Sequence, residues 1–290
     1  MEKVVFFICE GAHDVAFLYR LFRAEGFETY KEIIGKFPQP LNLFILEALR
    51  KSNYENMNLM ETRQKTIPAE ILLKNQTLVM LYDIGGDSNK NKRKDLIEKF
   101  LALKPSAESG GDEWVVKIDQ EYSFIYFFDA DNKGIGQRVK EIELEIKEIF
   151  KVDSLNISHA GKTQVLTGYE VGCYIFAKED GLGKLEDIMI PLMQEGNEEI
   201  FQKAADFLKL KEEGRLTKLE MKRTDGELEE KRSTKKLDFD EKKSQIGIAG
   251  QLQVSGKSNA VIIKDTDYIK LQKIRDNHLC RNILNFIHSL

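Results

Sequence analysis

The sequence predicts an α/β fold in which a parallel sheet is flanked by helices. Three short apolar runs, at residues 4–9, 77–82 and 124–128, have the length and the aromatic or β-branched content of buried strands. Each run precedes a stretch with the apolar spacing of an amphipathic helix. Strands that alternate with helices favour a parallel sheet, because a parallel neighbour is reached through a crossover that is usually helical.

The predicted elements occur in the order that such a sheet requires. A helix over 41–49 is expected to pack on the sheet through Leu43, Leu46 and Leu49, together with Phe44 and Ile45. The polar segment 51–74 is expected to be a flexible excursion. In chain order the other elements are a strand at 4–9, a helix at 14–25, a strand at 77–82, a helix at 91–103, an apolar run at 114–118, a strand at 124–128, a helix that ends at 150 and a strand at 172–177.

The chain divides by composition near residue 195. We expect residues 1–195 to form the α/β domain, with an insert at about 35–76, and residues 196–290 to form a charged helical extension packed on it. Between residues 203 and 243 the chain carries thirteen Lys or Arg and eleven Asp or Glu. This near balance favours solvated helices, or a hairpin around 224–226, over a tail of one sign.

Bulk composition limits the classes of function. The chain has 290 residues, 42% of them hydrophobic, and a net charge of −4, so any nucleic-acid binding must come from a local basic patch. Cys9, Cys173 and Cys280 lie far apart in apolar contexts, which predicts buried thiols in a reducing compartment. No stretch approaches the roughly 20 apolar residues of a membrane span, so a cytoplasmic protein without a membrane partner is expected.

Acidic residues follow two of the predicted strands. The run at 124–128 is followed by Asp129 and Asp131, and the run at 4–9 is followed by Glu10. On a strand, the side chains of residues i and i+2 lie on the same face. The carboxylates of both aspartates would therefore face one point if the strand continued through Asp131. The carboxyl ends of parallel strands form the ligand-binding edge of an open sheet, and oxygen ligands select a hard ion. The sequence therefore predicts a Mg²⁺ site, or a Mn²⁺ site, at this edge.

These residues resemble the motifs of the TOPRIM family. The family is marked by a strand that ends in Glu-Gly and a later strand that ends in Asp-x-Asp, and here these are Glu10-Gly11 and Asp129-Ala130-Asp131-Asn132-Lys133-Gly134. Topoisomerases, bacterial primases, ribosomal-RNA maturases and OLD-type nucleases belong to it, and this chain looks most similar to small stand-alone OLD-like members. The resemblance covers these short motifs. It implies a TOPRIM-like sheet and metal-dependent chemistry on phosphodiesters.

Further residues are candidates for the same site. Glu186, in a segment that resembles one found in OLD-like relatives, is a candidate metal ligand or an acid at a helix start. Asp14 is either a metal ligand or a helix cap, and Lys133 is a candidate for stabilising the pentavalent transition state. A basic run, made of Lys90, Lys92, Arg93 and Lys94, lies at the start of a predicted helix. We expect it to contact nucleic-acid phosphate; the alternative is a solvated charged surface.

The sequence leaves three functions open. The first is Mg²⁺-dependent phosphodiester hydrolysis of nucleic acid, in a defence or nucleic-acid processing system, in which Asp129 and Asp131 hold the metal and Glu10 binds a second ion or acts as general acid or base. The second is a non-catalytic regulatory or interaction protein, with a protein partner, on a TOPRIM frame. The third is a metal-dependent phosphohydrolase or transferase for small nucleotides.

Overall fold

The computed structural model describes residues 2–37, 40–50, 67–102, 120–224, 227–236 and 239–290. Its contacts divide the chain into two compact units, the first made of Met1–Ile188 with Lys270–Leu290 and the second of Met189–Ile269. The sequence placed all of residues 196–290 in one extension. Residues 270–290 belong with the first unit, and the rest of the expected extension falls in the second unit, which begins at Met189.

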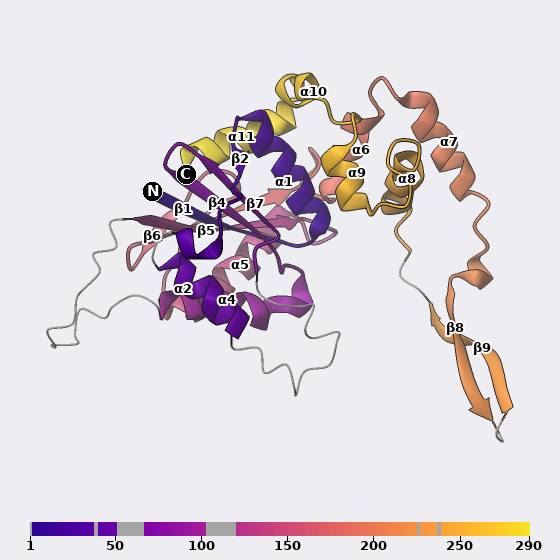
Figure 1. Ribbon diagram of the computed structural model, residues 1–290, viewed down its shortest axis with the longest axis horizontal. Coiled ribbons are helices and arrows are strands. Elements are labelled where there is room, and N and C mark those ends of the chain that lie inside the picture. The colour runs from indigo at the N-terminus through magenta and orange to yellow at the C-terminus, as the bar shows by residue number, and fades with distance from the viewer. Residues whose placement is uncertain (1, 38–39, 51–66, 103–119, 225–226, 237–238) are drawn as a thin grey trace, which may run out of the picture. The chain divides into compact units, whose positions relative to one another are not determined.

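The first unit contains a seven-stranded sheet of order β2-β3-β4-β1-β5-β7-β6 (Figure 1). The four central strands are parallel, and β3, β2 and β6 pair antiparallel at the two sides. The predicted α/β class is therefore confirmed. The strands are β1 (Lys3–Cys9), β2 (Glu28–Thr29), β3 (Glu70–Lys74), β4 (Thr77–Asp83), β5 (Glu121–Asp129), β6 (Gln164–Leu166) and β7 (Tyr169–Phe176).

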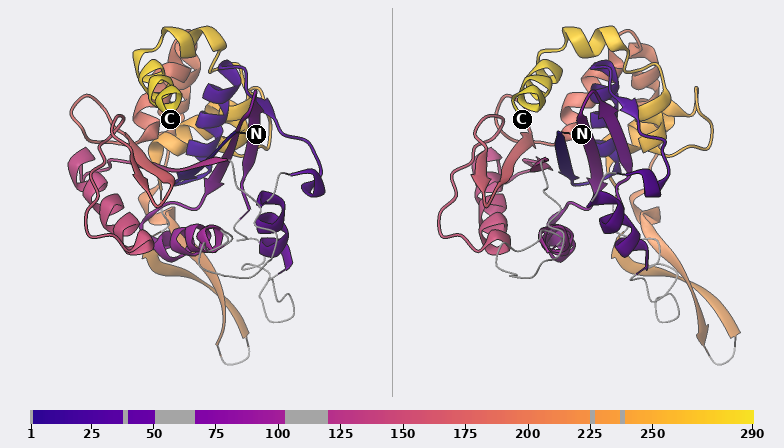
Figure 2. Two further views of the ribbon diagram at one scale, coloured as in Figure 1. Left: turned by 90° about the vertical axis from the view of Figure 1, so that its left-hand side faces the viewer. Right: turned by 60° about the vertical axis from the view of Figure 1, so that its left-hand side comes forward.

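Helices cover both faces of this sheet (Figure 2). On one face Phe6 of β1 packs against Phe44 and Phe100, with ring centroids 6.4 and 4.7 Å apart. On the other face Phe7 packs against Phe22, and Phe127 packs against Phe286. The first face carries α2 (Leu41–Arg50), α4 (Lys90–Leu101) and α5 (Ile135–Phe150), and the second carries α1 (Ala12–Ala24), α10 (Leu271–Asp276) and α11 (His278–Ser289). Short 3-10 turns lie at η1 (Ile34–Lys36) and η2 (Asp87–Asn89).

Two local predictions in the first unit need correction. The segment 51–74 was expected to be a polar excursion, but its last five residues form β3, in which Leu72 is fully buried against β4. Residues 51–66, like the apolar run at 114–118, lie outside the described residues. In α2 the predicted packing residues Phe44 and Ile45 are buried, whereas Leu43, also expected to pack on the sheet, is 50% exposed.

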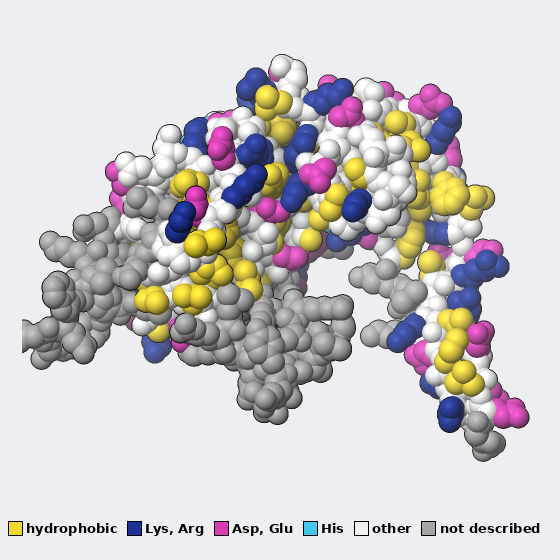
Figure 3. Space-filling model, in the orientation of Figure 1, with side chains coloured by type: hydrophobic (Ala, Val, Ile, Leu, Met, Phe, Trp, Pro, Cys, Tyr) yellow, Lys and Arg dark blue, Asp and Glu magenta, His cyan; other side chains and the backbone are white. Residues whose placement is uncertain are grey.

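The second unit is helical and carries one hairpin. Phe201, Ile246, Ile262 and Tyr268 are among its fully buried side chains. The hairpin has the predicted place, although residues 225–226 lie outside the described part, and Figure 3 shows both signs of charge along it. The elements are α7 (Glu198–Leu208), η3 (Glu213–Arg215), β8 (Thr217–Thr224), β9 (Glu227–Lys236), α8 (Glu241–Gly250) and α9 (Asn259–Asp265), and α6 (Leu185–Gln194) runs into the unit from the first. Within the described residues no helix has the length and hydropathy to cross a membrane.

Candidate functional site

The register of the parallel strands brings three acidic residues to one edge of the sheet. Cys9, the last residue of β1, pairs with Asp83 of β4 on one side and with Phe127 of β5 on the other. Glu10 follows β1 directly, and Asp129 is the last residue of β5. The carboxylates of Asp83, Glu10 and Asp129 therefore start from the carboxyl ends of adjacent strands, which is where open α/β sheets bind ligands.

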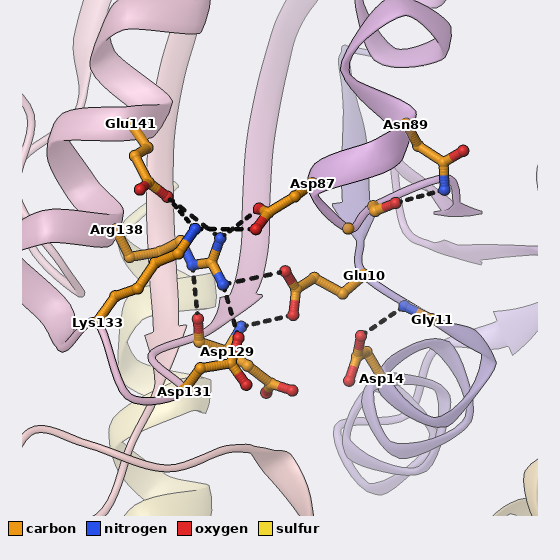
Figure 4. Close-up of polar contacts among 12 residues, drawn as sticks. Glu10, Gly11, Asp14, Asp87, Asn89, Asp129, Asp131, Lys133, Arg138 and Glu141 are labelled. Carbon is orange, nitrogen blue, oxygen red and sulfur yellow. Dashed lines mark hydrogen bonds and ion pairs between the residues drawn. The ribbon is translucent and has the colours of Figure 1, made fainter. Parts of the chain in front are cut away.

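Glu10 is tied to Asp129 by a hydrogen bond. The backbone amide of Asp129 donates to Glu10 Oε2 over 3.1 Å, and the Glu10 side chain is only 16% exposed (Figure 4). The loop after β4 fixes the backbone beneath it, because the Gly85 amide donates to the Cys9 carbonyl over 2.6 Å. A Cβ at Gly85 would lie 2.1 Å from the Glu10 Cα, so only glycine permits this approach.

Asp129 and Asp131 lie in different backbone settings. The strand ends at Asp129, and Asp131 adopts a left-handed conformation with φ 48°, so the two-residue alternation of a strand does not reach it. The Asp129 Oδ1 atom accepts from the Leu185 amide at 2.8 Å, whereas Asp131 exchanges two backbone hydrogen bonds with Gly183. The alternation that the expectation assumed therefore does not apply, because the chain turns between the two aspartates; the Asp131 carboxylate nevertheless lies near enough to contribute to the raised pKa values of Asp129 and Glu10.

A buried arginine, which sequence reasoning missed, lies among these acids. The Arg138 side chain on α5 is 2% exposed, and its Nη2 lies 2.7 Å from Asp131 Oδ2 and 3.7 Å from Glu10 Oε1. Its Nε donates to the Asp129 carbonyl over 2.8 Å. A signal was available, since Arg138 falls on the apolar stripe of its helix next to Val139, and a cation on a buried face requires acidic partners.

The Nη1 atom of the same guanidinium contacts a second group of charged side chains. Arg138 Nη1 lies 2.7 Å from Asp87 Oδ1 and 3.3 Å from Glu141 Oε2. The Lys133 ammonium binds the same two carboxylates, at 2.9 and 3.1 Å. Lys133 therefore lies beside the site, as a transition-state role would need, and it is held by two acids (Figure 4).

The other side of the cluster contains two buried acids from α1 and α6. Asp14 Oδ2 accepts from the Gly11 amide over 2.7 Å, which is the helix-capping arrangement. Glu186 is 2% exposed, and its Oε1 lies 2.9 Å from His13 Nδ1. The structure thus brings Glu186 next to the site, and it gives Asp14 a cap role while leaving it near Asp129.

Burial and mutual repulsion disfavour the charged forms of these acids. Burial, with the neighbouring Glu10 carboxylate as the next cause, raises the pKa of Asp129 to about 8. Burial also raises the pKa of Glu10, and it raises the pKa of Asp14 well above the ordinary value with a further contribution from Asp129. Because Asp129 titrates near neutral pH, a cation at this point would compete with protons.

The donor set can be compared with what a metal ion needs. Among the described residues, no three His, Cys, Asp or Glu side chains stand ready as metal ligands. The chemistry of the cluster nevertheless fits a hard cation: Glu10, Asp129 and Asp131 offer oxygen atoms, and burial has raised the pKa of the first two. Asp131 would have to turn away from Arg138 to contribute. The residues fit a metal ion in chemistry, with side chains that must rotate to hold it.

The predicted phosphate-binding run divides into two kinds of residue. Arg93 is 3% exposed, and its Nε and Nη2 donate to Glu145 over 2.8 and 2.7 Å, so its expected role in phosphate contact was wrong. Lys90 and Lys94 instead lie on the surface of α4, where both reach the Glu148 carboxylate. Helical spacing explains the difference, because Arg93 lies on the same face of α4 as the buried Leu96, Ile97 and Phe100.

Comparisons with known proteins bear on the fold. No family model and no curated protein matches this sequence. Among solved structures, the chain is similar to the crystal structure of a hypothetical protein from Pyrococcus horikoshii OT3. The two chains share 14% identity with a TM-score of 0.53, over 99% of this chain and 95% of the other. At this identity the similarity supports the fold alone.

Proposed function

We propose that this protein hydrolyses phosphodiester bonds in nucleic acid with Mg²⁺ or Mn²⁺ as cofactor. The observation that carries the proposal is the convergence of Glu10 and Asp129, from adjacent parallel strands, with pKa values that burial has raised. Such a pair keeps both charges only at a cost unless a cation joins it. The TOPRIM-like motif that contains these residues supports the same reaction class.

Each residue of the cluster has a role in this proposal. Glu10 and Asp129 would hold the ion. Asp131 would become a further ligand once it leaves Arg138, and Glu186 would be a ligand from the side of α6. When bound, the ion would neutralise phosphate charge and stabilise the leaving oxygen. Glu10 would also accept or donate a proton, since its raised pKa moves it toward neutral pH.

Lysines near the edge of the site would orient the polymer. Lys133 would approach the reacting phosphate, and Lys90, Lys92 and Lys94 at the start of α4 would contact the backbone of the nucleic acid. The last three supply charge without reading sequence, so binding would depend on salt. Arg93 is not included, because its guanidinium donates to the Glu145 carboxylate and to the Gly86 carbonyl inside the protein.

One observation favours a second candidate, a regulatory protein without catalysis. Arg138 already supplies a positive charge to Glu10 and Asp131 at 3.7 and 2.7 Å. If that arrangement is permanent, the acids are a structural ion cluster and the TOPRIM-like motif serves only the fold. The two candidates differ in one property, which is whether a divalent cation changes the protein.

A nuclease assay with matched variants tests the proposal. Purified protein is incubated with Mg²⁺, Mn²⁺ or chelator and with single- and double-stranded DNA and RNA, and a set of nucleotides is added to detect small-nucleotide hydrolysis. We expect metal-dependent cleavage that Glu10→Gln and Asp129→Asn abolish. Glu121→Gln is the control, because Glu121 is exposed at the opposite end of β5. Cleavage that survives in both site variants, or no cleavage and no effect of metal on the protein, would rule the proposal out.

A further inference from the structure

A recess lies next to the acidic cluster, beside α4 and α5. It has a volume of about 330 Å³, which is near the lower end of the roughly 300–1,000 Å³ typical of small-molecule sites. Phe128 lines it, and the guanidinium carbons of Arg93 and Arg138 lie 5.1 and 5.9 Å from the centre of that ring. Among the described residues, its charged lining includes Asp87, Lys90, Lys133, Glu141 and Glu145.

Charges of both signs line this recess, and the acids among them are paired. Glu145 binds Arg93, and Asp87 and Glu141 bind Lys133 and Arg138. The apolar part of the lining is formed by Phe128, Ile142 and Leu144. Of its cations, Arg93 is bound to Glu145 and Gly86 and Lys90 to Glu148, which leaves Lys133 and Arg138, beside the cluster, as the cations for a ligand that displaces their carboxylate partners. A group that carries a phosphate and a flat apolar part matches this combination.

Arg138 belongs to both the recess and the acidic cluster. Its Nη2 faces Asp131 and Glu10 in the cluster, whereas its Nη1 faces Asp87 and Glu141 of the recess. A divalent ion held by the cluster would repel this guanidinium and compete for its carboxylate partners. A guanidinium that loses such a partner becomes available to a phosphate, whose oxygens match its fork of donors.

We propose that Arg138 is an exchangeable counter-ion that couples metal binding at the cluster to phosphate binding in the recess. Without metal, Arg138 neutralises Asp131 and Glu10. With metal, Asp131 and Glu10 turn to the ion, and the freed Nη2 of Arg138 binds the phosphate of one nucleotide unit at the border between the cluster and the recess. Lys133 lies beside this phosphate, and the base lies against the apolar side of the recess. The inference rests on the proposed function, because it assumes that the cluster holds a divalent ion.

The coupling predicts opposite effects of one substitution on two ligands. In Arg138→Gln the competing charge is gone, so Mn²⁺ binding to chelator-treated protein, measured by calorimetry, should become about tenfold tighter. Binding of thymidine 5′-monophosphate to the Mn²⁺-saturated variant should become about tenfold weaker. Thymidine, which lacks the phosphate, should bind wild type and variant alike. These factors correspond to a coupling free energy of ordinary size.

Two further variants separate this role from simple damage to the fold. Lys140→Gln removes an exposed charge from the same helix and should change neither affinity. Arg138→Lys keeps one positive charge without the guanidinium fork, so its nucleotide affinity should fall while its Mn²⁺ affinity stays within about twofold of wild type. It provides the test if Arg138→Gln does not fold, and unchanged nucleotide affinity in Arg138→Lys would then overturn the inference.

The outcomes distinguish the inference from the function on which it rests. If wild type binds Mn²⁺ and Arg138→Gln weakens both ligands, or changes neither, Arg138 is structural or uninvolved and the coupling is refuted while the metal site stands. If folded wild type and folded Arg138→Gln both fail to bind Mn²⁺, the metal site and the coupling fail together.

Discussion

Glu10 accepts a hydrogen bond from the backbone amide of Asp129 at 3.1 Å, which joins the ends of two adjacent parallel strands. The bond places the two carboxyl groups in one partly buried environment. Burial then makes the charged forms costly, and the pKa of Asp129 rises to about 8. This pair is a point where folding and the proposed chemistry oppose each other, because the residues that would hold a cation destabilise the protein in its absence.

The first prediction is that Asp129 makes the metal-free protein less stable as pH rises. The folded pKa of about 8 lies above the ordinary value of about 3.8. Protonated Asp129 therefore contributes stability that is fully present below pH 3.8 and is lost as pH rises through 8. Asp129→Asn, neutral throughout, should gain at least about 1 kcal/mol over wild type at pH 8, a rise in Tm of about 2–4 °C.

Thermal melts in chelator at pH 5 and pH 8 check this, followed by melts in Mg²⁺. A metal concentration about a hundred times Kd should stabilise wild type by about 2.7 kcal/mol and should leave Asp129→Asn unchanged. If Asp129→Asn melts well below wild type in chelator, Asp129 is needed for the fold itself and the electrostatic argument for a metal site is lost.

The second prediction concerns Gly85, whose closeness to Glu10 leaves no room for a side chain. Gly85→Ala puts a methyl group 2.1 Å from the Glu10 Cα, so the backbone under Glu10 must move. We expect a loss of stability of about 1–3 kcal/mol and a fall in any cleavage rate on the order of a hundredfold.

Denaturant unfolding and the nuclease assay measure the two effects. Gly136→Ala is the control, because nothing lies within 4 Å of a Cβ at that helical position, and it should be neutral or stabilising by up to about 1 kcal/mol. Equal stability and activity in Gly85→Ala and wild type would show that Glu10 does not depend on this contact.

The third prediction is that Arg93 serves stability and not nucleic-acid binding. Arg93→Gln leaves Glu145 buried at 6% exposure of its side chain without its bidentate partner, which should cost about 3–5 kcal/mol. The double variant Arg93→Met with Glu145→Met removes both charges and should recover much of that loss. Urea unfolding of both variants measures these changes in stability. If Arg93→Gln is as stable as wild type, the structural role of Arg93 is contradicted.

The fourth prediction concerns the salt dependence of nucleic-acid binding. Replacing Lys90, Lys92 and Lys94 together by Gln should lower the log–log slope of affinity against salt by up to about 3 units, since each phosphate contact contributes about 0.9. The control replaces three hairpin lysines, Lys218, Lys222 and Lys231, which removes the same charge. If both triple variants keep the wild-type slope, the lysines of α4 are a solvated surface.

Local sequence patterns were sufficient to predict much of the first unit. The strands β1, β4 and β5 and the helices α1 and α4 were expected within a few residues of their bounds, and α5 was expected to end at residue 150, because each is an apolar run or stripe that its own residues specify. The placement of Glu10 and Asp129 at one edge also followed, since all parallel strands end on the same side of a sheet. Both inferences need only periodicity and chain direction.

The tertiary structure alone decided how the charged residues pair. Arg138 reaches Glu10 across 128 positions of sequence, and Arg93 reaches Glu145 across 52, so no local pattern names either partner. The turn at Asp131 likewise depends on its backbone bonds to Gly183 in a later loop. The sequence by itself determined the class of fold and the edge where acids gather, because those follow from local periodicity. Which of these acids are neutralised, and by which cation, depends on contacts that form only when distant segments pack together.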